Sequence, residues 1–416
     1  MKIQKILCAL LVPAFFISVL SSCSQKAGKD NSASSDSFYS ESGTVSATQS
    51  TGSALEQQIS SSNTSSSDSA EYPPRPQYTD TTSYLESMGA RFFGRCYYSA
   101  SDGFTYFNWS NSGFEFLTNG GKAEAYFKSD SYTLTGKAYI KVYVNDEEYK
   151  KIDIDKEGVY TLFEGLSGTN NVKVVKITEF RDNTLGVKDL NIIGGSVTGL
   201  PPEKTRRIEV IGDSITCGFS ILGNNAVNNN FVTYEEDSTL TWNSILAEYF
   251  GAMQYTVAFS GLGIVIGTGK SEDLIIENTY NNICSVDKVK NANSEAWYFS
   301  DYTPDLVIIN LGTNDAGTGI SKETVESGVK KLLTQVRSKY PHAAIVWCYG
   351  MMTDDYWLNI KSGVEESGIS DCYFVKLPRQ SKGKDGNPGA AGHPNLKTNR
   401  RAADTLIPFI EELMHW

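Results

Sequence analysis

A serine that could act as a nucleophile is the first chemical feature of this sequence. Ser214 stands in the motif Gly212-Asp213-Ser214, at the end of the apolar run IEVIG. A serine hydroxyl attacks a carbonyl at neutral pH only when a base takes its proton and hydrogen-bond donors stabilise the oxyanion that forms. The motif therefore predicts a hydrolytic site only if those partners exist elsewhere in the chain.

Few residues are candidates for the base, because the chain has only three histidines. His342 precedes an expected strand, which places it at the wrong edge of the sheet, and His415 is the penultimate residue. His393 lies in the segment AAGHPNL, a glycine- and proline-rich loop between the last expected strand and the last expected helix. By elimination, His393 is the candidate general base.

The elements that must position these residues form an α/β pattern at residues 205–416. Apolar runs such as IEVIG, YTVAFSG, DLVIINLG, AAIVWCYG and CYFVKLP alternate with helical stretches. Continuous apolar strands between helices predict a parallel sheet with helices on both faces, a three-layer α/β/α domain. Active groups in such sheets gather at the carboxyl ends of the strands. Ser214 and the motif Gly312-Thr313-Asn314-Asp315 both fall at such ends.

Apolar residues recur with a different period at residues 76–200. Short segments such as GFTYFNW and AYIKVYVN alternate apolar and polar residues, and turn formers such as TNGG and SGTN separate them. This pattern predicts an antiparallel β-sandwich or jelly roll. Two prolines in GLPPEKTRR mark the joint between the two domains.

The first residues predict where the protein is located. Residues 1–23 combine two lysines, an apolar stretch and small residues ending at Cys23, which is typical of a secretory signal. Leu20-Ser21-Ser22-Cys23 resembles a bacterial lipobox, so we expect Cys23 to be lipidated; the alternative is an ordinary cleaved signal with a chance cysteine. Residues 24–75 are rich in serine and predict a disordered linker. The expected location is extracytoplasmic, as a cell-envelope lipoprotein held to the membrane through Cys23.

The composition of the chain limits the classes of partner and cofactor that we expect. The formal net charge of −11 argues against a nucleic-acid partner and favours neutral, solvated substrates. The cysteines after Cys23 are odd in number and have no repeated close spacing, so no disulfide framework is expected. The chain also has neither a CxxC pair nor an HExxH motif, so we expect no metal site and no cofactor.

The order of three motifs resembles that of the SGNH (GDSL-like) hydrolase family. Gly212-Asp213-Ser214, Gly312-Thr313-Asn314-Asp315 and Gly392-His393-Pro394 follow one another at expected strand ends, and the resemblance extends from about residue 207 to 416. It implies that Ser214 is the nucleophile and His393 the base. It also implies an oxyanion hole formed by the backbone N–H groups of Ser214 and Gly261 and the side chain of Asn314, with Gly263 as a second choice of glycine.

One departure from that family concerns the third member of a triad. Most members carry an aspartate two or three residues before the histidine, where this chain has Ala390 and Ala391. Either a backbone carbonyl orients the imidazole of His393, or a carboxylate reaches it from further away. Asp385 is the nearest upstream candidate for such an orienting acid.

The order of the two domains resembles carbohydrate esterase family 2. Members of that family remove O-acetyl groups from plant polysaccharides such as xylan and mannan, and they commonly lack a complete triad. The resemblance implies a serine esterase whose partner is an acetylated polysaccharide or oligosaccharide, with Trp357 as a candidate sugar platform or else a packing residue. The alternatives are a lipase or thioesterase-type acyl hydrolase, and a catalytically weak carbohydrate-binding surface lipoprotein.

Overall fold

The computed structural model describes residues 84–179, 183–283 and 296–416. The expected signal peptide with Cys23 and the expected linker at residues 24–75 lie outside the described residues. The described residues form one compact unit. Within the described ranges, none of the helices combines the length and the apolar character needed to cross a membrane.

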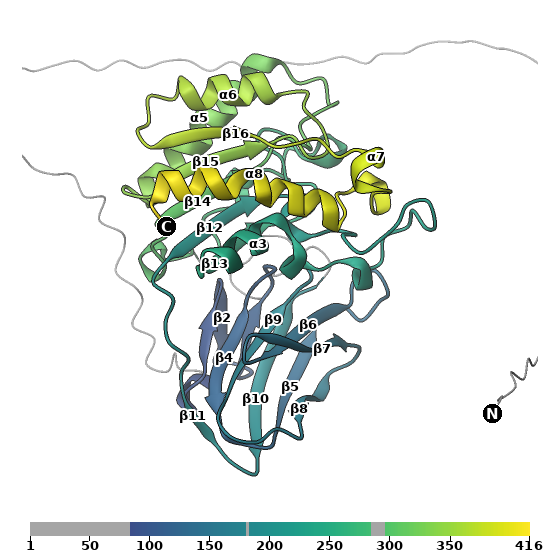
Figure 1. Ribbon diagram of the computed structural model, residues 1–416, viewed down its shortest axis with the longest axis vertical. Coiled ribbons are helices and arrows are strands. Elements are labelled where there is room, and N and C mark those ends of the chain that lie inside the picture. Colours follow the sequence, from purple (N-terminus) through teal and green to yellow (C-terminus); the bar gives the residue numbers. More distant parts are fainter. Residues whose placement is uncertain (1–83, 180–182, 284–295) are drawn as a thin grey trace, which may run out of the picture. The chain divides into compact units, whose positions relative to one another are not determined.

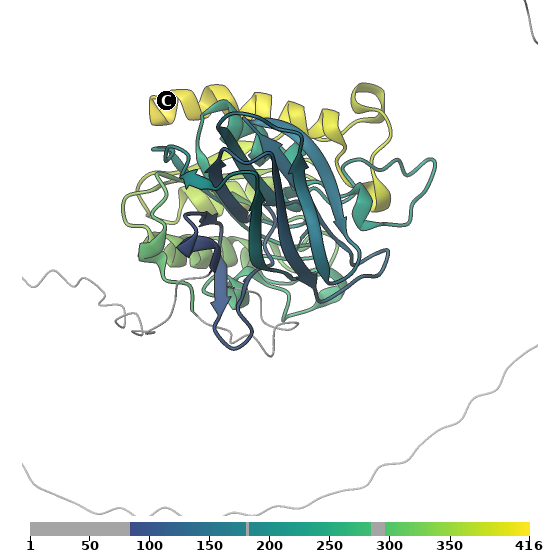
Figure 2. The same ribbon diagram turned by 90° about the horizontal axis from the view of Figure 1, so that it is seen from below.

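The first domain is the predicted antiparallel sandwich (Figures 1 and 2). After the short helix α1 (Tyr84–Ser87), one sheet has the order β1-β4-β9-β6-β7, with β11 also paired to β4, and the other has the order β2-β3-β10-β5-β8. The strands show the predicted alternation of burial. In β5, Ala123, Ala125 and Phe127 are buried, while their neighbours are partly exposed. The strand bounds are β1 Arg91–Phe93, β2 Cys96–Ser99, β3 Phe104–Phe107, β4 Gly113–Thr118, β5 Lys122–Ser129, β6 Ala138–Val144, β7 Glu147–Ile154, β8 Gly158–Glu164, β9 Asn170–Lys176, β10 Leu185–Ile193 and β11 Val197–Gly199.

The second domain has the predicted parallel sheet, with five strands in the order β13-β12-β14-β15-β16. These strands are β12 Arg207–Gly212, β13 Met253–Ala258, β14 Leu306–Asn310, β15 Ala344–Tyr349 and β16 Cys372–Lys376. One face packs against α3 (Trp242–Tyr249) and α8 (Leu396–Met414), and the other packs against α5 (Lys322–Lys339) and α6 (Trp357–Glu365) (Figure 1). Helices on both faces explain why the strands read as continuous apolar runs.

Short helices and 3₁₀ turns lie in the connections between these strands and helices. They are α2 Ser214–Cys217, α4 Ile276–Thr279 and α7 Lys382–Asp385, with 3₁₀ turns at Thr233–Glu235, Ser238–Leu240, Thr268–Lys270, Phe299–Asp301 and Ala390–Gly392. The strand that follows β12 in sequence, β13, lies next to it on one side of the sheet. The strand that follows β14, β15, is added on the opposite side. Ligands of open α/β sheets bind where strand order reverses in this way, so the crevice beyond β12 and β14 is the expected site.

The two domains contact each other through buried charged side chains. Arg95 of the sandwich donates to the carbonyl oxygens of Tyr280 and Asn282 at 2.5 and 2.9 Å, and it pairs with Glu209 of β12 at 3.4 Å. Lys141 of β6 pairs with Asp237 at 2.9 Å. Removing one partner of a buried ion pair typically costs about 3–5 kcal/mol of stability, so these contacts hold the domains in a defined arrangement.

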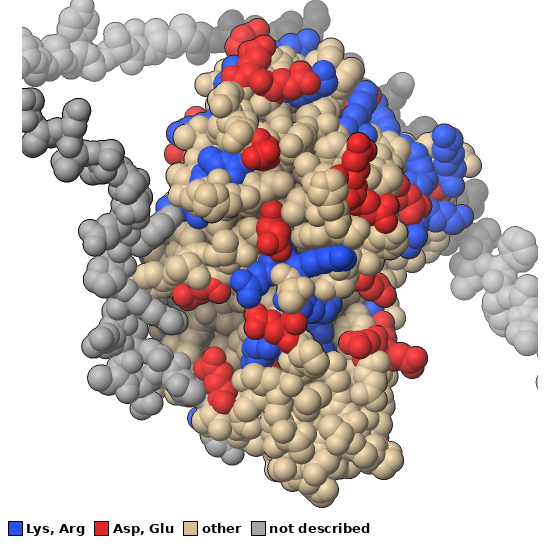
Figure 3. All heavy atoms as spheres, turned by 60° about the vertical axis from the view of Figure 1, so that its left-hand side comes forward, with Lys and Arg blue, Asp and Glu red and all other residues tan. Residues whose placement is uncertain are grey.

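Surface charge is mixed on the face that Figure 3 presents. Acidic and basic side chains are interspersed there rather than separated into fields of one sign. The net charge of −11 therefore does not form a single acidic field over this face.

Candidate active site

The nucleophile candidate begins a one-turn helix at the carboxyl end of β12. Asp213 caps α2: its Oδ1 accepts the N–H of Ile215 at 3.0 Å. Gly212 leaves no room for a side chain, because a Cβ there would lie 2.0 Å from Oγ1 of Thr216. The strand, the cap and this close approach together fix the backbone of Ser214, whose residue surface is only 5% exposed.

The structure places His393 directly beside Ser214. Nε2 of His393 lies 2.8 Å from Oγ of Ser214, and Nδ1 lies 2.9 Å from the carbonyl oxygen of Ala390. A carbonyl can only accept a hydrogen bond, so Nδ1 carries the proton and Nε2 is the free acceptor. That tautomer is the one that can take the proton of the serine hydroxyl.

Asp385 does not orient the ring, which corrects one of the two expectations for the missing acid. Both of its carboxylate oxygens accept from Nη1 of Arg401, at 2.6 and 2.5 Å, and Oδ2 also accepts the N–H of Ser381 at 2.8 Å. The side of the imidazole that a triad acid would contact is taken by the Ala390 carbonyl. The backbone-carbonyl alternative is the one that the geometry fits.

The environment of His393 keeps it neutral. Its ring centroid lies 4.3 Å from that of Phe219, which stacks on Phe231 at 3.8 Å. Burial lowers the pKa of His393 to about 4, although the hydrogen bond to the Ala390 carbonyl acts in the opposite direction. At neutral pH the imidazole is therefore available as a proton acceptor.

Asn314 lies between the two segments that carry the other predicted oxyanion donors. Its Nδ2 donates to Oδ2 of Asp213 at 3.3 Å and to the carbonyl of Leu262 at 2.9 Å, next to Ser214 and Gly261 respectively. Among the described residues, no protein acceptor takes the backbone N–H of Ser214 or Gly261. The second-choice glycine, Gly263, already donates its N–H to Leu274 at 3.0 Å.

A buried carboxylate fixes the loop that contains Gly261. Asp315 accepts three backbone N–H groups, from Ile264 at 2.9 Å, Val265 at 2.8 Å and Ile266 at 3.1 Å. Burial raises the pKa of Asp315, while these three hydrogen bonds act to lower it. Asp315 therefore acts on the loop and not on the reacting atoms.

Trp357, the candidate sugar platform, is the first residue of α6 and is partly exposed. Nζ of Lys376 lies 3.9 Å from the centroid of its ring. One face of the indole therefore carries an ammonium group rather than being open. A role in sugar binding remains a prediction.

Sequence reasoning missed the segment that supports the histidine loop. The N–H of Ala390 donates to Oγ of Ser220, and the N–H of Ala391 donates to Oδ1 of Asn229, both at 2.9 Å. Both acceptors come from the stretch that follows α2 and reads as an asparagine-rich connection. Its position directly after the nucleophile helix was the available signal, because that stretch must leave from the same edge of the sheet.

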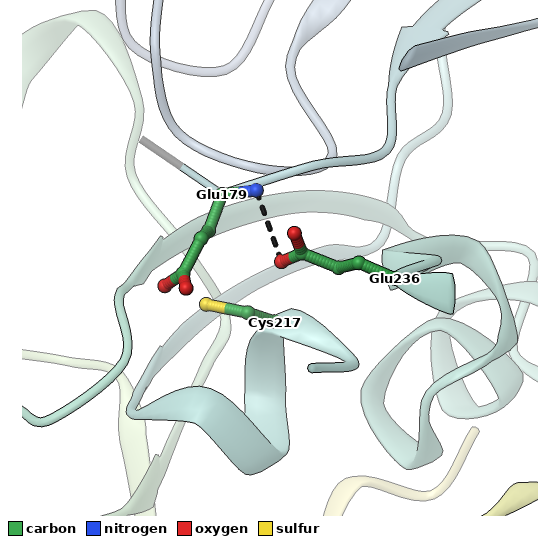
Figure 4. Close-up of side chains that lie close together, drawn as sticks. All are labelled: Glu179, Cys217 and Glu236. Atoms are coloured by element: carbon green, nitrogen blue, oxygen red, sulfur yellow. Dashed lines mark hydrogen bonds between the residues drawn. The ribbon is translucent and has the colours of Figure 1, made fainter. Parts of the chain in front are cut away.

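One buried cluster in the described part of the chain has a spacing that a metal ion could bridge (Figure 4). The ligand atoms of Glu179, Cys217 and Glu236 lie within 4.8 Å of one another. The backbone N–H of Glu179 donates to Oε1 of Glu236 at 3.0 Å, and burial raises the pKa of the Cys217 thiol. No sequence motif indicated this cluster, because its members come from three separate segments.

Two segments of the chain match known families. Residues 210–366 match the GDSL-like lipase/acylhydrolase family, and residues 92–201 match the N-terminal domain of carbohydrate esterase family 2. The chain is therefore similar to the GDSL-like lipase/acylhydrolase family in its second domain and to carbohydrate esterase family 2 in its first. His393 lies beyond the matched segment of the hydrolase, so its assignment rests on the contacts described above.

Individual relatives of the chain are distant. It is 27% identical over 321 residues to the cellulase/esterase CelE of Acetivibrio thermocellus, an alignment that covers 74% of this chain but 38% of CelE. It is 23% identical over 275 residues to an acetylxylan esterase / glucomannan deacetylase of Cellvibrio japonicus, covering 64% and 73% of the two chains. A solved family two carbohydrate esterase from Clostridium thermocellum, in complex with cellohexaose, has a TM-score of 0.71 and 26% identity, covering 79% of this chain and 100% of that one.

Proposed function

We propose that the protein is a serine esterase that removes O-acetyl groups from polysaccharides such as xylan or mannan, or from their oligosaccharides. The 2.8 Å contact between Nε2 of His393 and Oγ of Ser214 carries the proposal. The relative named as an acetylxylan esterase / glucomannan deacetylase supports the reaction class and the substrate class.

Acylation uses Ser214 as the nucleophile. Its Oγ forms a bond to the acetyl carbonyl carbon while Nε2 of His393 takes the hydroxyl proton. The carbonyl oxygen becomes an oxyanion, for which the backbone N–H groups of Ser214 and Gly261 are donors. The amide of Asn314 becomes the third donor when one of its N–H bonds turns from Asp213, 3.3 Å away, to the oxyanion. The bond from the carbonyl carbon to the sugar oxygen then breaks, and His393 returns the proton to that oxygen.

Deacylation repeats these steps with water. His393 takes a proton from a water molecule, whose oxygen bonds to the carbonyl carbon of the acetyl-serine. The bond to Oγ breaks, Oγ recovers its proton from His393, and acetic acid leaves and gives its remaining acidic proton to water, forming acetate. The chain's own residues supply every proton transfer up to the release of acetic acid.

The Ala390 carbonyl performs part of the work of a triad acid. Replacing the acid of a triad by its amide lowers kcat by about 10⁴, because the wrong tautomer of the histidine results. A backbone carbonyl has no N–H to offer, so it enforces the correct tautomer through its 2.9 Å contact with Nδ1. It stabilises the transient imidazolium with a dipole rather than with a full negative charge.

The experiment measures acetate release from acetylated xylan, acetylated mannan and 4-nitrophenyl acetate by the purified protein, with Ser214→Ala as the control. We expect the parent to release acetate from at least one polysaccharide and the variant to release none above background. Preference for long-chain acyl esters or thioesters over all acetates would favour a lipase or thioesterase. Glycan binding without any hydrolysis would favour a carbohydrate-binding role.

We also propose that this esterase is exported and held to the bacterial membrane by a lipid on Cys23. The support is the Leu20-Ser21-Ser22-Cys23 pattern after an apolar stretch. Expression in a bacterial host with an alkyne-bearing fatty acid should label the parent and not Cys23→Ala. Equal labelling of both would contradict the anchor.

A further inference from the structure

A glutamate of the sandwich domain reaches the oxyanion loop of the hydrolase domain. Glu179 lies three residues after the end of β9, and its side chain is fully buried. Its Oε2 accepts the backbone N–H of Ser260, the residue immediately before Gly261. A residue outside the α/β domain therefore fixes the peptide next to a predicted oxyanion donor.

The same carboxylate also faces the nucleophile helix. The Sγ of Cys217 lies within 4.8 Å of a Glu179 carboxylate oxygen, and Figure 4 shows the sulfur directed toward that carboxylate. Cys217 ends α2, the one-turn helix that Ser214 begins. One side chain thus joins the helix of the nucleophile to the loop of the oxyanion donor.

Glu179 is itself held on both sides of its backbone. Its N–H donates to Oε1 of Glu236 at 3.0 Å, and its carbonyl oxygen accepts from Nζ of Lys176 at 3.1 Å. Lys176 is buried and also donates to the carbonyl of Asn108 at 3.1 Å. These hydrogen bonds fix the backbone from which the carboxylate of Glu179 reaches Ser260.

The loop around Gly261 is consequently fixed at two ends by two different domains. Glu179 holds Ser260, and Asp315 holds the N–H groups of residues 264–266. Catalytic donors must be placed within about 0.5 Å of the productive geometry, and their supporting contacts decide whether they are. Loss of either carboxylate would leave the loop attached at one end only.

We propose that Glu179 is a positioning residue of the esterase site, so that the sandwich domain completes the active site rather than only flanking it. This inference rests on the proposed function. Glu179→Ala removes the acceptor of the Ser260 N–H and the carboxylate that faces the Cys217 sulfur. Removing an oxyanion donor outright costs about 10²–10³ in kcat, so loosening one should lower kcat by about 10- to 100-fold. KM should change little, because Glu179 is buried and does not touch the substrate.

The test measures kcat and KM with 4-nitrophenyl acetate for the parent, Glu179→Gln and Glu179→Ala in the full chain. Active sites are counted by end-point labelling with a fluorophosphonate, so that kcat refers to folded sites only. Glu179→Gln retains one acceptor oxygen and should fall between the parent and Glu179→Ala. It also keeps the experiment decisive if Glu179→Ala does not fold.

Glu209→Gln is the matched control. Glu209 is another fully buried glutamate at the contact between the domains, where it accepts from Arg95, Tyr280 and Tyr340. Its substitution should lower the melting temperature while leaving kcat per labelled site within about twofold of the parent, since a buried network away from the reacting atoms contributes mainly stability. The two glutamates thereby separate loss of stability from loss of positioning.

Three results would count against the inference. One is a kcat per labelled site that stays within about threefold of the parent for both Glu179 variants, because losing a single oxyanion donor lowers kcat by far more. Another is an equal loss in Glu209→Gln. The third is a loss of parent activity on dialysis against EDTA that zinc restores, which would assign the cluster to a metal. An inactive parent, indistinguishable from Ser214→Ala, would instead overturn the proposed function itself.

Discussion

The carbonyl oxygen of Ala390 lies 2.9 Å from Nδ1 of His393, on the side of the imidazole opposite Ser214. A backbone group thus stands where a triad would place a carboxylate. Because this acceptor carries no formal charge and the ring is packed against Phe219, the imidazole stays neutral over most of the pH range. The predictions below follow from this arrangement and from the loops that hold it.

The pH dependence of kcat/KM should report the lowered pKa of His393. The neutral ring is the active base, and burial lowers its pKa to about 4, so activity should stay on a plateau down to about pH 5 and fall below it. A pH profile with 4-nitrophenyl acetate measures this limb. An acid limb centred near the ordinary histidine value of about 6.5 would contradict the environment described for the ring.

Asp385→Asn should cost stability and not catalysis. The substitution weakens the contact with Arg401, which forms two hydrogen bonds at 2.6 and 2.5 Å, and leaves the Ala390 contact intact. We expect a lower melting temperature and a kcat within about threefold of the parent, whereas loss of a true triad acid costs about 10⁴. Arg401→Gln is the control, because it breaks the same pair from the other side. A loss of kcat near 10⁴ in Asp385→Asn alone would show that Asp385 does orient the base.

Gly261→Ala should impair the oxyanion site. Gly261 has φ of +91°, and an added Cβ would lie 2.6 Å from Cγ2 of Thr268. The loop must shift, so kcat should fall by about 10²–10³, the usual loss for one oxyanion donor. Gly269→Ala is the matched control: it has φ of +68° in the same loop, and an added Cβ would meet nothing within 4 Å. Equal kcat values for the two variants would remove Gly261 from the oxyanion hole.

Asn229→Ala should act through the peptide that orients the base. Oδ1 of Asn229 accepts the N–H of Ala391, which belongs to the same peptide unit as the Ala390 carbonyl. Without it we expect kcat to fall by about 3- to 10-fold with KM nearly unchanged, the effect of one lost neutral hydrogen bond of about 1 kcal/mol. The neighbouring Asn230→Ala is the control, since Asn230 is also exposed and its hydrogen bonds with Asn228 are made by its backbone. Unchanged kcat in Asn229→Ala would limit that contact to a structural role.

The architecture could be predicted because it depends on patterns that the sequence displays directly. The five strands of the parallel sheet are apolar runs, and those of the sandwich alternate, so hydrophobic period alone separates the two domains. The contacts between domains could not be predicted. Arg95 and Glu209 are more than a hundred residues apart and would each be expected on the surface, because charged residues are rarely buried without a partner.

The site was predictable where the chemistry requires a particular side chain. Ser214 could be matched to His393 because the chain offers so few histidines. A backbone carbonyl was one of the two predicted orienting groups, but which carbonyl could not be predicted, because every residue has one. Its placement depends on Ala391 adopting a left-handed φ of +51°, a conformation that nothing in the segment AAGHP signals. The role inferred for Glu179 was hidden for a similar reason, since its targets are a backbone N–H and a thiol.

The central claim is that Ser214 and His393 together hydrolyse acetyl esters of a polysaccharide. The most direct test is the rate of acetate release from acetylated xylan at pH 7 by the parent, Ser214→Ala and His393→Ala, at equal concentrations of folded protein. We expect the parent to turn over and both variants to lose at least about 10⁴-fold in kcat, since members of such a catalytic unit fail together. Retention of the parent's rate by either variant would contradict the assignment.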